Sequence, residues 1–164
     1  MKDFRDIPEP IRNAVMSARS IAIWPIDESP MSDSYQTARY FQDQGLAVFP
    51  IHDMLERILE TPVYRDIRLI PEDYDILLLF VQPDSLPEVV NAIFIADYIP
   101  PLIWAHEGIV DLASIDRLGQ AGIMVVMDRD LRLFHQFWRD RELEGEGEGP
   151  SGGITGEDRN SLQL

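Results

Sequence analysis

The sequence predicts an α/β protein, a doubly wound parallel sheet of five strands with flanking helices in three α/β/α layers. Five continuous apolar runs carry this prediction. Unbroken rather than alternating apolar runs are typical of strands covered on both faces, and their spacing of roughly 20 to 30 residues suits parallel crossovers. The runs are SIAIW from Ser20, LAVFPI from Leu46, YDILLLFV from Tyr74, PLIWA from Pro101 and GIMVVM from Gly122.

Helix start and stop signals stand between most of these runs, as the prediction requires. An opening helix, PEPIRNAVMSA, and a closing helix, LRLFHQFWRDR, are expected to flank the sheet. The internal signals are Asp33 or Ser34 before YQTARYFQDQ with Gly45 after it, a capping box of Ser85 and Glu88 before VVNAIFIADY, and Asp111 before LASIDRLGQA with Gly122 after it.

The segment between the second and third runs, DMLERILETPVYRDIRLIPED, lacks a long helical pattern and contains Pro62 and Pro71. Proline interrupts helices, so we expect a short helical turn followed by an extended connection over the surface. This segment is expected to cap the binding crevice.

Composition indicates one folded domain over residues 1–141, since 164 residues with 45% hydrophobic content suffice for a single core. Residues 142–164 hold six acids against one arginine and six of the ten glycines, and are predicted to be a disordered acidic tail. The chain has no cysteine, which excludes disulfides, thiolate metal sites and a cysteine nucleophile.

The net charge of −15 disfavours nucleic acid and anionic membrane surfaces as partners. No apolar stretch approaches the roughly 20 residues of a membrane span, and the N-terminal MKDFRDIPEP does not resemble a secretory signal. The expected location is the cytoplasm.

Ligands of open parallel sheets lie beyond the carboxyl ends of the strands, so the residues that follow each run are the candidate site. Two of the three histidines and many acids fall there. The candidates are Pro25, Ile26, Asp27 and Glu28; His52 and Asp53; Val81, Gln82 and Asp84; His106, Glu107 and Gly108; and Asp128, Arg129 and Asp130.

Over roughly residues 7–136 the chain resembles the small CoA-binding Rossmann proteins, relatives of the CoA-binding domain of succinyl-CoA synthetase. The resemblance implies a Rossmann-like sheet in the CoA-binding strand order, CoA as the cofactor, and a nucleotide or acyl-CoA as the small-molecule partner. Its most telling pieces are Pro30 with Ser34-Tyr35 and Ala38, Pro62-Val63-Tyr64, Pro83 with Pro87-Glu88, Trp104 with Gly108, and Val125-Val126-Met127-Asp128-Arg129.

The resemblance also implies a set of cofactor-binding positions around the sheet edge. These are Pro25, Ile26, Asp27, Ser29, Pro30, Ser32, Ser34, Tyr35, His52, Val81, Gln82, His106, Gly108 and Arg129. Several of them depart from the family pattern, in which the first strand ends in a Gly-hydrophobe-Ser turn and an arginine follows the loop proline. Here Pro25-Ile26-Asp27 and Ser32 occupy these places. Further departures are His52-Asp53 for Asn-Pro, Val81-Gln82 where an arginine is usual, His106 for glutamine and Asp130 for cysteine.

The departures weaken phosphate binding for physical reasons. Pro25 has no N–H to donate and Asp27 adds a negative charge, whereas a glycine would let the backbone approach a phosphate. The loss of one charge-assisted hydrogen bond, about 1.5 to 3 kcal/mol, together with a nearby carboxylate reduces affinity by about a hundredfold. The helix N-terminus at Ser32, Asp33 and Ser34 still favours an anion, unless Asp33 caps it with its own side chain.

Two alternatives to a nucleotide site remain open. The first is a Zn, Mn or Fe site on the same rim, with His52, Asp53, His106 and Glu107 as candidate ligands beside Asp27 and Asp130, although no spaced metal motif supports it. The second is an interaction module without nucleotide, for example a homodimer, that uses the aromatic residues of the closing helix. Core packing is the favoured use of those aromatic residues.

Nothing in the sequence indicates an enzyme, because no G-x-S-x-G elbow and no serine with an activating histidine is recognisable. Arg129 is the remaining cation of the rim, and a salt bridge with Asp128 or Asp130 is its expected use. His135, within the closing helix, is expected to pack there or to lie at the helix end.

Overall fold

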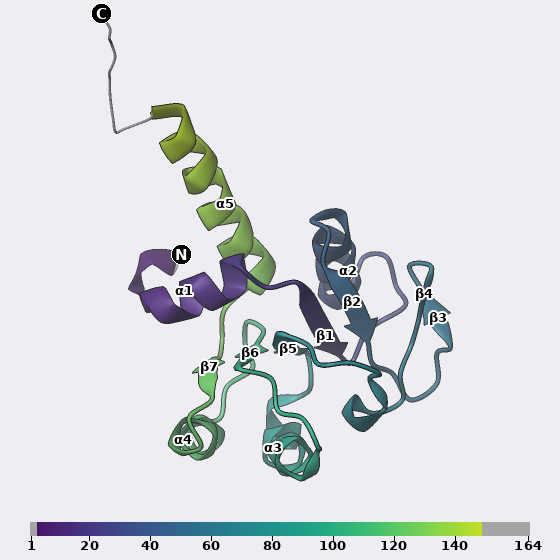
Figure 1. Ribbon diagram of the computed structural model, residues 1–164. Helices are drawn as coiled ribbons and strands as arrows, with labels where there is room; N and C mark the ends of the chain where they lie inside the picture. Colours follow the sequence, from purple (N-terminus) through teal and green to yellow (C-terminus); the bar gives the residue numbers. More distant parts are fainter. Residues whose placement is uncertain (1–2, 149–164) are drawn as a thin grey trace, which may run out of the picture.

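The computed structural model describes residues 3–148. Its centre is a five-stranded parallel sheet in the order β2-β1-β5-β6-β7, which confirms the predicted fold class (Figure 1). Each strand lies within one of the five apolar runs, because an unbroken apolar run can be covered by helices on both faces. The strands are β1 (Ser20–Trp24), β2 (Ala47–Pro50), β5 (Ile76–Leu79), β6 (Leu102–Ala105) and β7 (Met124–Val126).

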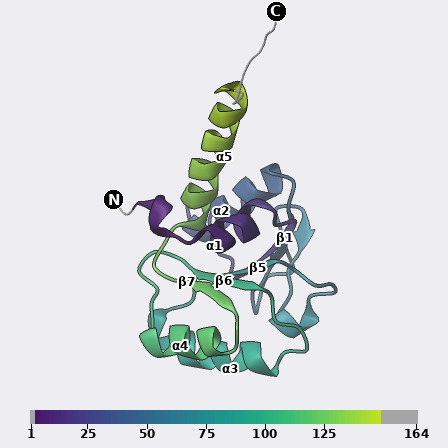
Figure 2. The same cartoon turned by 60° about the vertical axis from the view of Figure 1, so that its left-hand side comes forward.

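Five helices cover the two faces of the sheet in three layers. In Figures 1 and 2, α1 (Glu9–Met16), α2 (Asp33–Asp43) and α5 (Leu131–Glu148) lie on one side. The other side is covered by α3 (Leu86–Ile95) and α4 (Leu112–Gln120). A 3₁₀ turn, η1 (Phe4–Asp6), precedes α1, and two more turns, η2 (Ile67–Leu69) and η3 (Pro83–Ser85), stand in the connections before β5 and α3.

Each face of the sheet has its own hydrophobic core. On the α1, α2 and α5 side, Phe41, Trp104 and Phe134 have no exposed surface. On the α3 and α4 side, Leu77 and Leu118 are buried as completely. The closing helix therefore uses Phe134 for core packing, as favoured from the sequence.

Two of the three predicted helices begin at a side-chain cap, but at α2 the cap is Ser32 rather than the predicted Asp33 or Ser34. Ser32 Oγ accepts from the backbone N–H of Tyr35 at 3.2 Å, and an Asp111 carboxylate oxygen accepts from Ser114 N at 3.0 Å. The predicted capping box of Ser85 and Glu88 is wrong. The η3 turn runs directly into α3 and holds Ser85 in a helical conformation, in which its side chain makes no capping hydrogen bond.

The connection between β2 and β5 begins with a small hairpin rather than with the helical turn that we predicted. Strands β3 (Arg57–Ile58) and β4 (Thr61–Pro62) pair antiparallel across Leu59 and Glu60, which both have positive φ. Hairpin turns of this kind usually carry Asn-Gly, so Leu59-Glu60 gives no turn signal in the sequence. A bridge between Ile51 and Tyr64 attaches the hairpin to the end of β2.

Helix α5 continues to Glu148 and projects beyond the rest of the molecule (Figures 1 and 2). The boundary predicted after residue 141 therefore falls inside this helix, and the other residues of the predicted tail, 149–164, lie outside the described part. None of the helices described in residues 3–148 has the length and apolar character needed to cross a membrane.

His135 is buried between α2 and α5, where it packs in the helix as the sequence suggested. Its Nδ1 lies 2.7 Å from the Tyr40 hydroxyl, and its ring makes edge contacts with Phe41. Burial lowers the pKa of His135 from its usual 6.5, and the charge of nearby Arg139 lowers it further. The imidazole is therefore neutral at pH 7 and shares a hydrogen bond at Nδ1 with the Tyr40 hydroxyl.

This burial predicts that His135 destabilises the protein in mild acid. In the unfolded chain His135 binds a proton near pH 6.5, whereas in the folded protein it binds a proton only at a lower pH. The free energy of unfolding therefore falls as the pH drops below about 6.5. The slope from one such group is at most about 1.4 kcal/mol per pH unit. In urea unfolding between about pH 7.5 and pH 5.5, His135→Gln should lose less stability than the wild type; equal slopes would show that His135 makes no contribution.

Candidate functional site

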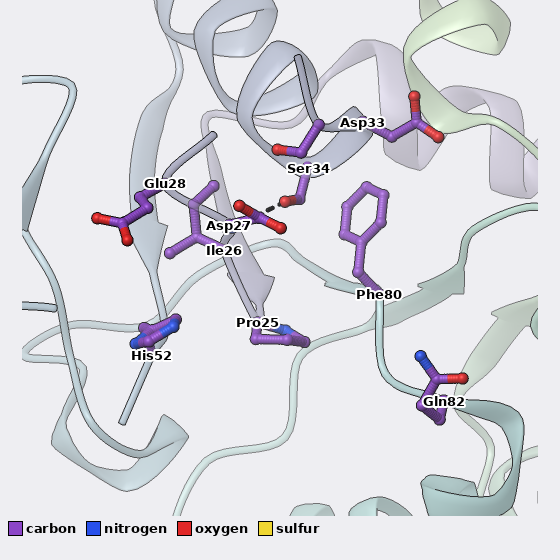
Figure 3. A pocket seen from close by; sticks show the side chains of 10 residues that line it. Pro25, Ile26, Asp27, Glu28, Asp33, Ser34, His52, Phe80 and Gln82 are labelled. Atoms are coloured by element: carbon purple, nitrogen blue, oxygen red, sulfur yellow. Dashed lines mark hydrogen bonds between the residues drawn. The ribbon is translucent and has the colours of Figure 1, made fainter. Parts of the chain in front are cut away.

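A pocket of about 470 Å³ opens at the carboxyl ends of β1, β2 and β5, beside the N-terminus of α2. This is the edge at which open parallel sheets bind their ligands. Figure 3 shows Glu28 and His52 on one side of the pocket and Phe80 and Gln82 on the other. The lining residues are Pro25, Ile26, Asp27, Glu28, Ser32, Asp33, Ser34, His52, Phe80 and Gln82.

The loop between β1 and α2 is held by short-range hydrogen bonds that replace a glycine turn. The Asp27 N–H donates to Ser34 Oγ at 2.9 Å, as the dashed line in Figure 3 shows. The Asp27 carboxylate in turn accepts from Ser29 N at 2.8 Å, and Ser32 N donates to the Ser29 carbonyl at 3.0 Å. The Asp27 N–H is therefore satisfied within the protein and does not point a free donor at a ligand.

The pocket is acidic. Asp27, Glu28 and Asp33 line it, and the lining contains no lysine or arginine. Carboxylates repel a phosphate, and an arginine fork would be the usual attraction. The lining therefore has the negative charge, and lacks the arginine, that the sequence indicated.

One favourable feature for an anion remains at the start of α2. Ser32 is the N-cap residue and uses its side chain on Tyr35 N, so Asp33 does not cap the helix. The backbone N–H groups of Asp33 and Ser34 make no hydrogen bond within the described structure. Free N–H groups and the helix dipole at this end attract negative charge.

His52 faces the pocket but is already engaged. Its Nδ1 accepts from the backbone N–H groups of Met54 at 2.9 Å and Leu55 at 3.1 Å, and lies 3.6 Å from an Asp53 carboxylate oxygen. These two hydrogen bonds hold the turn after β2, and the chain then continues into the β3–β4 hairpin rather than into the helical turn predicted there. A histidine that accepts at Nδ1 carries its proton on Nε2, so it offers a ligand a donor.

The loops after β6 and β7 form a second group of polar residues next to the pocket. His106 Nε2 lies 3.2 Å from Asp33 Oδ2, and the His106 ring packs against Phe80 with 4.7 Å between ring centres. His106, Glu107 and Asp130 each bring one ligand-type atom to within 4.8 Å of the others. Asp33 and Phe80 therefore connect this group to the pocket.

Arg129 does not contribute a positive charge to the pocket. Its Nη2 lies 2.9 Å from both carboxylate oxygens of Asp6, so the salt bridge expected with Asp128 or Asp130 is wrong. The partner comes from η1 at the other end of the chain, which sequence proximity does not reveal. Asp128 instead accepts from the Gly108 N–H at 2.7 Å.

The structure brings part of the predicted site together. Of the predicted metal ligands, His106 and Glu107 meet, with Asp130 as the third group, while His52 and Asp53 stand apart from them. Ser29, Pro30, His106, Gly108 and Arg129 do not line the pocket; Tyr35 lines a separate cavity with Arg39, and Val81 lines another with Glu88. The predicted positions that do line it are Pro25, Ile26, Asp27, Ser32, Ser34, His52 and Gln82.

Three residues that line the pocket, Glu28, Asp33 and Phe80, are absent from the predicted cofactor-binding positions, although Glu28 is among the candidates after the strands. Phe80 is the residue after β5 and belongs to the apolar run YDILLLFV, and the end of such a run at the sheet edge is a signal for a ligand-facing residue. Asp33 was considered as a helix cap. No local pattern indicates its contact with His106, which is distant in sequence.

Comparisons with known proteins agree with this architecture. The profile of the family described as CoA binding domain matches residues 19–136. The uncharacterised protein YneT of Bacillus subtilis is 23% identical over 125 residues, which cover 76% of this chain and 91% of YneT.

Solved structures show the same fold. The protein called cell-free ID.343 from Thermus thermophilus superimposes with a TM-score of 0.68 at 26% identity, covering 82% of this chain and 98% of that one. A hypothetical protein from Pyrococcus horikoshii gives a TM-score of 0.69 at 18% identity, covering 83% of this chain and 95% of that one. With its sheet order, its pocket at the strand ends and a profile match over most of its length, the chain belongs to the CoA-binding domain family.

Proposed function

We propose that the protein is a non-enzymatic ligand-binding domain that binds CoA or a related nucleotide in the pocket at the N-terminus of α2, with weakened affinity. The observation that carries this proposal is the pocket itself, about 470 Å³ at the carboxyl edge of a CoA-family sheet. Its position and the free N–H groups of Asp33 and Ser34 favour an anionic ligand.

The composition of the lining argues for weak rather than tight binding. Asp27 and Glu28 are exposed carboxylates at the mouth, and no arginine or lysine of the lining compensates for them. A phosphate bound at the α2 N-terminus would gain the helix dipole, about 0.3 to 1 kcal/mol, but not an arginine contact of about 1.5 to 3 kcal/mol. The remaining attraction comes from uncharged contacts such as those of Phe80 and Gln82.

The test is an NMR titration of the full-length protein with CoA, with ADP as a shorter nucleotide. We expect saturable shifts of the Asp33, Ser34 and His52 amides with a dissociation constant of about 100 μM or weaker, given a hundredfold loss from a micromolar site. The amides of Leu46 and Gly122, at the opposite edge of the sheet, serve as internal controls. Shifts centred on those control residues, or no shift at millimolar CoA, would contradict nucleotide binding, and micromolar affinity would contradict weakening.

A further inference from the structure

We propose that His106, Glu107 and Asp130 bind a divalent transition-metal ion at the carboxyl ends of β6 and β7. Their three ligand-type atoms lie within 4.8 Å of one another. His106 and Glu107 follow β6 directly, and Asp130 immediately precedes α5. None of the three proposed ligands lines the nucleotide pocket, which this site adjoins through Asp33 and Phe80, and the proposal does not depend on the function proposed for that pocket.

Three hydrogen bonds fix the two loops that carry these residues to each other. Trp104 Nε1 donates to the Arg129 carbonyl at 2.8 Å, and Arg129 N donates to the Ala105 carbonyl at 3.4 Å. The Gly108 N–H donates to the Asp128 carboxylate at 2.7 Å. These bonds place His106 and Asp130 next to each other before any metal binds, which reduces the cost of assembling the site.

Two of the three proposed ligands are buried and keep an atom available. His106 and Asp130 are each 8% exposed. Asp130 Oδ1 accepts from Leu133 N at 3.0 Å, and its other oxygen makes no hydrogen bond within the described residues. His106 contacts Asp33 through Nε2 and makes no hydrogen bond at Nδ1. The Asp130 carboxylate already caps α5 through Leu133 N, and a bound cation would add the opposite charge that this neutral donor does not supply.

The Asp33 contact prepares His106 for metal binding. When Nε2–H donates to the Asp33 carboxylate, the neutral ring carries its lone pair on Nδ1, the form that ligates a metal. A carboxylate on the second ring nitrogen is also the usual outer partner of metal-bound histidines, and it fixes the orientation of the ring. Asp33 is thus proposed as a positioning residue for the site.

The ligand set selects the class of metal. One imidazole nitrogen and two carboxylate oxygens suit Zn²⁺ and Mn²⁺ better than Mg²⁺ or Ca²⁺, which prefer oxygen alone. Tetrahedral zinc with bonds of about 2.1 Å holds its ligands roughly 3.4 Å apart, so separations of up to 4.8 Å must contract by at most about 1.4 Å. Glu107 is exposed and is free to make most of that movement, while the buried pair stays in place.

The experiment is a calorimetric titration of full-length, chelator-treated protein with ZnCl₂, supported by the visible spectrum of bound Co²⁺. We expect one saturable site whose affinity falls at least tenfold in Glu107→Gln and in His106→Gln. Asp33→Asn should weaken binding by about tenfold through the orientation of His106. Because Glu107 is exposed, its variant keeps the fold and remains informative even if His106→Gln does not fold.

His52→Gln is the matched control, since His52 lies on the same rim but uses Nδ1 for backbone contacts. Its zinc affinity should equal that of the wild type. The acid-rich segment after Glu142 is present in every variant. If zinc bound only to that segment, the wild type and all variants would have the same zinc affinity. Equal affinities in wild type and Glu107→Gln, or loss of binding in His52→Gln, would overturn the proposal.

Discussion

Trp104→Ala should lower the free energy of unfolding by about 3 to 5 kcal/mol, the range for removing a large aromatic side chain from a core. Trp104 has no exposed surface, stands in β6 near the middle of the sheet, and packs against Phe134 with 5.2 Å between ring centres. Its indole N–H also donates to the Arg129 carbonyl, so the variant loses apolar contacts and a partly buried hydrogen bond together. Urea unfolding followed by circular dichroism measures the effect.

Two further variants separate the contributions of Trp104. Trp104→Phe keeps an aromatic ring but leaves the Arg129 carbonyl without its donor, for an expected loss of about 1 to 3 kcal/mol beyond any change in packing. Leu112→Ala, at a side chain that is 77% exposed on α4, should change stability by no more than about 0.5 kcal/mol. A loss below about 1 kcal/mol in Trp104→Ala would contradict the assignment of this residue to the core.

The second large effect is expected in the pocket. The double variant Asp27→Asn with Ser32→Arg removes one carboxylate and adds a guanidinium beside the free N–H groups of α2, so CoA affinity should rise about a hundredfold. Asparagine retains the side-chain oxygen that accepts from Ser29 N. Replacing the N-cap Ser32 costs about 1 kcal/mol of stability, which the fold should tolerate.

A control variant with the same change in net charge is available on α4. Asp116→Asn with Gln120→Arg alters two exposed residues of a helix that does not line the pocket. Because distant surface charges are screened by salt, this variant should bind CoA like the wild type. A similar gain in both double variants would mean that overall charge, rather than the pocket, controls binding.

The fold was largely predictable because its signals are local. The run SIAIW coincides with β1, and Ser32 to Ser34 contain the cap and first residues of α2, as burial and capping rules require. The β3–β4 hairpin was missed because Leu59 and Glu60 adopt positive φ without glycine or asparagine. The positive φ is set by the pairing of the two short strands, which the sequence does not encode locally.

The candidate site was less predictable because its decisive contacts join distant parts of the chain. Positions after strand ends identified most of the pocket, since the parallel topology brings those ends to one edge. Two contacts join elements that are distant in sequence, the Arg129–Asp6 salt bridge and the Asp33–His106 contact. No local sequence pattern predicts either of them. The acidic character of the site was predicted correctly, because the acids of the loop after β1 do line the pocket.

The measurement that tests the central claim most directly is the calorimetric affinity of CoA for the wild-type protein at about 50 and about 300 mM NaCl, beside the Asp27→Asn, Ser32→Arg variant. An acidic pocket repels phosphate, and salt screens that repulsion, so wild-type affinity should be weak and should stay level or increase with salt. The variant should bind about a hundredfold tighter at low salt and lose affinity as salt rises. Micromolar wild-type binding that weakens with salt would contradict the account, because it would reveal a phosphate clamp that the acidic pocket does not provide.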